Sequence, residues 1–133
     1  ALPVQIITNG ERPKKGVVKI PTTENHLVLS RNRTLNYSVD PIDNFYHPSV
    51  DVFFHSISTH WFGKIIGVIL TGMGKDGADG LLAIKEKGHH TIAQNEESSI
   101  VYGMPKAAAK NGAAKEILPL TEIGGRIVSL VQP

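Results

Sequence analysis

The residues with the clearest chemical potential lie in the sequence GMGKDG, where one carboxylate, Asp76, stands between Gly74 and Gly77. The turn follows the apolar run KIIGVILT and precedes an amphipathic segment, so it joins a buried strand to a helix. Open α/β sheets carry their functional groups in such turns, at the carboxyl ends of the strands. The glycines permit unusual backbone conformations and leave room for a partner side chain. The pattern indicates that Asp76 is one member of a catalytic set.

Asp76 also has a structural interpretation, as the N-cap of the helix that follows it. An aspartate at a helix start accepts N–H hydrogen bonds and complements the helix dipole. Spacing alone does not separate the two interpretations, and the flanking glycines favour a site.

The same turn matches the pattern G-x-G-x-x-G of dinucleotide-binding folds, with Glu96 and Glu97 about twenty residues downstream, where a ribose-binding acid is expected. A carboxylate at position 76 would repel a pyrophosphate at close range. A Walker loop is excluded because Asp76 follows Lys75 where Ser or Thr is required. We therefore disfavour a dinucleotide site and expect no cofactor.

No catalytic partner for Asp76 is evident in the chain. The absence of cysteine excludes thiol nucleophiles and zinc–thiolate sites. No serine lies in a glycine-flanked elbow, and Ser98 and Ser99 are interpreted as loop or capping residues. No histidine pair has the spacing of metal ligands, so we expect surface or hydrogen-bonded histidines and no metal. The histidines are His26, His47, His55, His60, His89 and His90.

Length and charge limit the partners. The 133 residues suit one domain, and a net charge of +2 with scattered basic residues argues against nucleic acid. The longest apolar run, residues 65–70, is too short for membrane insertion, and no signal peptide is visible. A cytoplasmic protein is expected.

Short strands are expected in the first forty residues, at 4–8, 17–20, 26–30 and 34–39, the last two forming a hairpin around residues 31–33. Pro48 is expected in the first turn of a helix that runs to Trp61. One buried face of that helix is expected to carry Val50, Phe53, Phe54, Ile57 and Trp61.

Strands and helices then alternate. Strands are expected at 64–71, 90–94 and 116–120, and a helix at 77–87 that ends at Gly88. Pro105 opens a helix that ends at residues 111–112, and Thr121 caps a last helix. Such βαβ units predict an α/β fold with a doubly wound, mainly parallel sheet, helices on both faces and a β-hairpin near the N-terminus.

Two segments, LTGMGKDGADG and AQNEESSIVYGMPKAA, resemble the catalytic domain of the chemotaxis protein-glutamate methylesterases of the CheB type. GERPKKGVVKIPTTENHLVL and HPSVDVFFHSIS are similar to upstream segments of that family. The resemblance spans nearly the whole chain. It implies hydrolysis of glutamate methyl esters, and in many members deamidation of glutamine, on the cytoplasmic domains of chemoreceptors.

The resemblance makes Asp76 the acid of a Ser-His-Asp triad. Such an acid holds the histidine tautomer and stabilises the imidazolium. By the same resemblance, the neighbours of the active site are Met73, Gly72, Gly74, Gly103 and Met104. Tyr46-His47 replaces the more usual His-Arg before PSVD.

The serine and histidine motifs of the family, and its receiver domain, are absent from the chain. Residues 1–133 therefore correspond to the C-terminal two-thirds of a catalytic domain, and we expect them to be inactive alone. An exposed strand edge and apolar helix faces predict association with the missing N-terminal part or self-association. A non-catalytic receptor-binding relic is the alternative.

Overall fold

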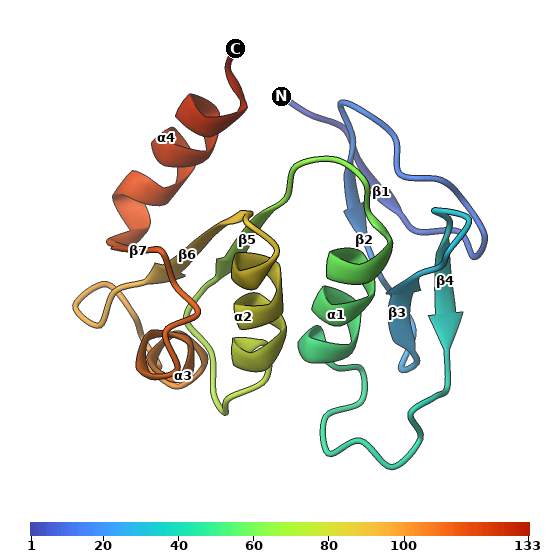
Figure 1. The fold of residues 1–133 in the computed structure, drawn as a ribbon, viewed down its shortest axis with the longest axis horizontal. Helices are drawn as coiled ribbons and strands as arrows, with labels where there is room; N and C mark the ends of the chain where they lie inside the picture. Colours follow the sequence, from blue (N-terminus) through green and yellow to red (C-terminus); the bar gives the residue numbers. More distant parts are fainter.

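A computed structural model describes all 133 residues, and it consists of short strands followed by alternating helices and parallel strands (Figure 1). The strands are β1 (Val4–Ile6), β2 (Val18–Ile20), β3 (His26–Leu29), β4 (Leu35–Ser38), β5 (Ile66–Ile69), β6 (His90–Gln94) and β7 (Glu116–Leu118). The helices are α1 (Val50–His60), α2 (Ala78–Glu86), α3 (Met104–Lys110) and α4 (Leu120–Val131). Each element that the sequence predicts is present, with strands that are mostly shorter than expected.

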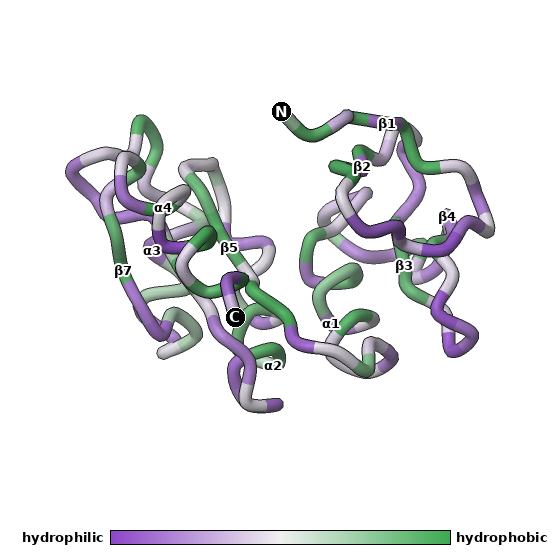
Figure 2. Tube along the Cα trace, turned by 90° about the horizontal axis from the view of Figure 1, so that it is seen from above, coloured by the Kyte–Doolittle hydropathy of each residue, from purple (hydrophilic) through white to green (hydrophobic).

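The parallel strands lie in two separate sheets. β1 pairs with β2, with Val4 opposite Val18, and β5, β6 and β7 form a second sheet in that order. β3 and β4 form the predicted antiparallel hairpin. Figure 2 shows the β1–β2 pair and the second sheet on opposite sides of the molecule. The predicted α/β class is confirmed, and one edge of β5 has no partner strand.

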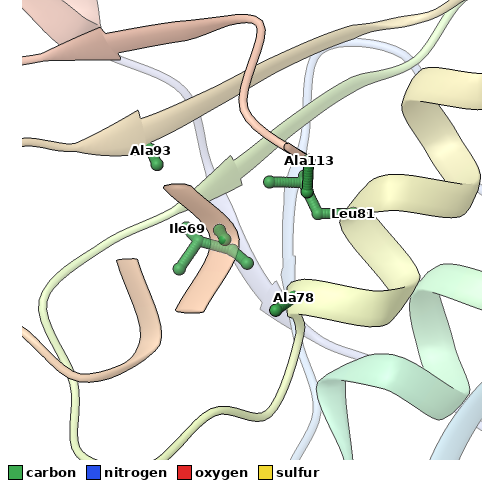
Figure 3. Packing of buried hydrophobic residues seen from close by; sticks show 6 residues of the cluster. Ile69, Ala78, Leu81, Ala93 and Ala113 are labelled. Atoms are coloured by element: carbon green, nitrogen blue, oxygen red, sulfur yellow. The ribbon is translucent and has the colours of Figure 1, made fainter. Parts of the chain in front are cut away.

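The principal core lies where α2 and α3 cover the second sheet. Small alanines at four of its six positions let the helices approach the strands closely, and Leu81 fills the space between them (Figure 3). The core residues are Ile69, Ala78, Leu81, Ala93, Ala108 and Ala113. A Cβ at Gly67 of β5 would lie 2.6 Å from Leu81 Cδ1, so α2 rests directly on the strand that leads to the candidate site.

The structure corrects two predicted helix starts. Pro48 precedes the N-cap Ser49 instead of occupying the first turn, because the Ser49 hydroxyl, which caps the helix, fixes the boundary one residue later. Thr121 lies inside α4, whose N-cap is Pro119 in an extended conformation with no side-chain hydrogen bond. Gly88 follows α2 with φ 89° and ends it as predicted.

The apolar face of α1 is only half-buried, against the expectation of a buried face. Phe53 lines two cavities of about 320 and 350 Å³ between the helix, the hairpin and β2, and Ile57 lines the first of them. The face therefore lacks part of the cover that its sequence pattern predicts. No helix has the length and apolar character needed to span a membrane.

Candidate active site

Asp76 lies in the turn between β5 and α2 and is only 6% exposed. Its carboxylate accepts three hydrogen bonds from the start of α1. Oδ1 accepts from the Ser49 hydroxyl at 2.8 Å and from the Asp51 amide at 3.0 Å, and Oδ2 accepts from the Val50 amide at 2.7 Å. A negative charge at a helix N-terminus is stabilised by the unpaired amides and the helix dipole.

Asp76 thus caps the neighbouring helix, whereas the sequence suggested a cap on its own helix. The N-cap of α2 is Gly77, with φ 98° and no side chain to offer. Asp51 supplies the capping side chain that Gly77 lacks, since Asp51 Oδ1 accepts a hydrogen bond from the Gly80 amide at 2.7 Å. The two helices begin side by side at the same end of the molecule (Figure 1), and each receives a carboxylate from the other segment.

The exchange gives Asp51 an unusual environment. Burial raises the pKa of Asp51, the Gly80 hydrogen bond opposes that effect, and the nearby carboxylates of Asp76 and Asp79 raise the pKa further. The first turn of α1 therefore holds a carboxylate whose charge the fold disfavours.

A buried serine contacts Asp76 and a buried histidine contacts the backbone of that serine, yet the three are not connected as a catalytic triad. The Ser49 hydroxyl donates directly to Asp76, with no imidazole between them. The ring of His26, which is fully buried, faces the Ser49 amide with Nδ1 at 3.0 Å and the Pro41 carbonyl with Nε2 at 3.0 Å. Neither ring nitrogen bonds the Ser49 hydroxyl, so Ser49 has no general base.

The two glycine motifs meet beside the acid. The Gly72 carbonyl accepts hydrogen bonds from the amides of Gly103 at 3.2 Å and Met104 at 2.9 Å. A Cβ at Gly103 would lie 2.7 Å from the Gly72 oxygen, and a Cβ at Gly72 would lie 2.7 Å from Met104 Sδ. Gly72, Gly103 and Met104, predicted from separate motifs, are therefore in direct contact.

Tyr46 packs on the other side of the turn. A Cβ at Gly74, which has φ 93°, would lie 2.5 Å from the Tyr46 hydroxyl oxygen, and that oxygen accepts a hydrogen bond from the Lys75 amide at 3.2 Å. Met73, between the two glycines, is 84% exposed. The turn thus presents a methionine to solvent beside a buried carboxylate.

The geometry argues against phosphate binding at this turn. The amide of Gly80, near the start of α2, already donates to Asp51, and Tyr46 and Met104 occupy the space beside Gly74 and Gly72. A pyrophosphate would have to displace a carboxylate and two side chains. Ser98 also has a structural role, since its hydroxyl accepts from the Leu120 amide at 3.0 Å and donates to Asn95 at 2.6 Å.

Sequence reasoning did not find the residues that hold Asp76. The three donors, Ser49, Val50 and Asp51, are distant from Asp76 in the chain. Only Ser49-x-Asp51 at a helix start carries a local signal, that of an acidic capped N-terminus. Which carboxylate that N-terminus receives depends on the packing of α1 against α2.

Comparison with known proteins gives consistent matches. The family model described as CheB methylesterase matches residues 1–127. The chain is 53% identical over 131 residues to "Protein-glutamate methylesterase/protein-glutamine glutaminase 2" of Burkholderia orbicola (strain AU 1054), which covers 98% of this chain and 39% of that protein. It is 52% identical over 132 residues to "Protein-glutamate methylesterase/protein-glutamine glutaminase 1" of Bordetella avium (strain 197N), covering 99% of this chain and 39% of that protein.

A solved structure is also similar, the crystal structure of the Thermotoga maritima CheB methylesterase catalytic domain. The TM-score is 0.84 at 35% sequence identity, and the match covers 96% of this chain and 69% of that chain. The chain therefore has the fold of that catalytic domain, and it spans 39% of the length of these two curated relatives.

Proposed function

This chain belongs to the CheB methylesterase family, and from that premise we propose that it supplies the acid of an ester-hydrolysing active site. Asp76 is the acid of a Ser-His-Asp triad whose serine and histidine come from polypeptide outside the 133 residues. The substrates are glutamate methyl esters, and also glutamine side chains, on chemoreceptor cytoplasmic domains. Methanol is released from the ester and ammonia from the amide.

The chemistry assigns one task to each member of the triad. The serine oxygen attacks the ester carbonyl while the histidine accepts its proton, and the histidine then returns that proton to the departing methanol oxygen. Asp76 accepts the second imidazole N–H, fixes the tautomer and stabilises the imidazolium. Water then hydrolyses the acyl-enzyme by the same route.

The observation that carries this proposal is a buried carboxylate that is fixed by hydrogen bonds and has no imidazole partner. Asp76 is fixed by three donors in the turn between β5 and α2, and no histidine of the chain hydrogen bonds to it. Met73 projects into solvent from the same turn, and Gly103 and Met104 lie against it. We place all of these neighbours at the border of the active site, together with Gly72 and Gly74.

Residues 1–133 are, in this proposal, part of a catalytic domain and are inactive alone. The match to 69% of the solved catalytic domain supports this, as does the unpaired edge of β5. We propose that the serine and histidine segments of the whole domain cover the apolar cavities beside α1. Partners of the isolated chain are therefore that N-terminal part or a second copy.

Methanol release from methylated receptor tests the proposed function. The protein encoded by the full-length reading frame should release methanol, and the purified 133-residue chain should release no more than a nonspecific trace. Rapid methanol release by the 133 residues alone would refute the triad assignment. A full-length protein that binds receptor but releases no methanol would identify a binding relic instead.

A further inference from the structure

We propose that Ser49 is a positioning residue for Asp76, holding the carboxylate so that one defined acceptor site remains for an incoming imidazole. The inference rests on the proposed function and extends it to a residue of α1.

The hydroxyl proton of Ser49 is donated to Asp76. Ser49 Oγ accepts a hydrogen bond from the Val52 amide at 3.3 Å, as the N-cap of α1, and it lies 2.8 Å from Asp76 Oδ1. A carboxylate can only accept, so the hydroxyl must donate to it. Ser49 as a whole is only 4% exposed, so solvent competes little for its side chain.

His26 attaches Ser49 to the start of β3. The Ser49 amide donates to His26 Nδ1 at 3.0 Å, which places the ring proton on Nε2, where it donates to the Pro41 carbonyl at 3.0 Å. Both ring nitrogens are thereby used within the buried network. The chain of hydrogen bonds from Pro41 through His26 and Ser49 to Asp76 fixes the acid from a part of the fold remote in sequence.

The pattern of donors selects one oxygen of Asp76 for the imidazole. A carboxylate offers about four lone-pair positions, two on each oxygen. Oδ1 already accepts from the Ser49 hydroxyl and the Asp51 amide, whereas Oδ2 accepts from the Val50 amide alone. The remaining position therefore lies on Oδ2, and Ser49 keeps the carboxylate from rotating to offer Oδ1 in its place.

The test measures the kinetics of methanol release from methylated receptor by the protein that the full-length reading frame encodes. Ser49→Gly removes the donor and retains most of the capping preference, because glycine is tolerated at an N-cap. We expect kcat to fall roughly tenfold, the scale of one hydrogen bond to a charged group, with KM unchanged. Ser49→Thr keeps the hydroxyl and should restore kcat.

Ser56→Ala is the matched control. It deletes another α1 hydroxyl, one that accepts from the Leu29 amide at 2.8 Å and donates to the Phe53 carbonyl at 2.7 Å, with no contact to Asp76. Its melting temperature should fall while its kcat stays at the wild-type value. An equal fall in kcat for Ser56→Ala and Ser49→Gly would overturn the proposal, because general destabilisation would then explain both.

Asp76→Asn separates this inference from the proposed function. If Asp76→Asn retains kcat, the triad assignment itself fails. If Asp76→Asn loses kcat while Ser49→Gly retains it, the assignment stands and the positioning role fails. Ser49→Ala is a second variant that lacks the hydroxyl. If Ser49→Gly and Ser49→Ala both fail to fold while Ser56→Ala folds, the Ser49 hydroxyl has a purely structural role and the positioning role is overturned.

Discussion

Asp76 combines a structural contact with a proposed catalytic task at the scale of one residue. Two of its three hydrogen bonds satisfy the amides of Val50 and Asp51, which helix α1 cannot pair internally, and the third comes from the Ser49 hydroxyl. The same bonds hold the carboxylate rigid, which is what orientation of an imidazole requires. A substitution at Asp76 therefore changes stability and chemistry together, and the two effects must be measured separately.

Asp51 provides a prediction about pH. Its pKa is raised by burial and by the carboxylates of Asp76 and Asp79, despite the hydrogen bond from Gly80. The fold thus disfavours the ionised form, so the stability associated with neutral Asp51 is complete below the ordinary aspartate pKa of about 3.9. That stability is lost as the pH rises through the raised value.

Asp51→Asn should remove this dependence and keep an oxygen for the Gly80 amide. We expect the free energy of unfolding of the wild type, relative to Asp51→Asn, to fall as the pH rises from the ordinary aspartate pKa of about 3.9 through the raised pKa of Asp51. Urea denaturation of both proteins at a series of pH values measures the difference. A difference that stays constant across this range would contradict the assignment.

Among the helices and strands, the contact between α1 and α2 determines how the carboxylates of the site are placed. A Cβ at Gly80 would lie 2.5 Å from Phe54 Cβ and 3.2 Å from the Asp51 Cα. The glycine lets the two helix N-termini approach closely enough for Asp76 to accept hydrogen bonds from the start of α1 and for Asp51 to accept one from α2. Without that approach, neither carboxylate could reach the other helix.

Gly80→Ala should destabilise the chain by about 1–3 kcal/mol through overpacking, although alanine is the better helix former. Gly124→Ala in α4 is the matched control, because its Cβ would have no neighbour within 4 Å. That change should stabilise by about 0.5–1 kcal/mol. Urea denaturation of both variants checks the signs, and a stabilised Gly80→Ala would disprove the close contact.

The elements themselves could be predicted from sequence, whereas their partners could not. The period of apolar residues placed each helix and strand, and Gly88 marked the end of α2, because these signals are local. Two helix starts were wrong where competing caps lay a residue or two away, at Pro48 and Thr121. The interhelical use of Asp76 depends on packing, and no spacing within the chain encodes it.

The separation of the parallel strands into two sheets dominates the molecule at the largest scale (Figure 2). All of β1 is exposed, including Val4 at 61% and Ile6 at 63%, and β5 has one unpaired edge. Apolar cavities of about 320 and 350 Å³ lie beside α1. Exposed apolar strands and open edges favour association with further polypeptide.

We therefore expect the purified chain to self-associate when no other segment of the domain is supplied. Sedimentation velocity should show species above the 14.4 kDa monomer, in proportions that rise with concentration. Ile6→Lys should shift the distribution toward monomer, because a charge on β1 opposes burial of that strand. Ile42→Lys, at a loop residue that is 74% exposed, should leave it unchanged. A monomer at all concentrations would count against this expectation.

The turnover of Asp76→Asn in the full-length protein tests the central claim most directly. The variant should lose about four orders of magnitude in kcat for methanol release, as expected when the acid that holds an imidazole tautomer is removed. Circular dichroism must show that the variant remains folded, since Asp76 also caps α1. A folded Asp76→Asn protein with a kcat within tenfold of wild type would contradict the account.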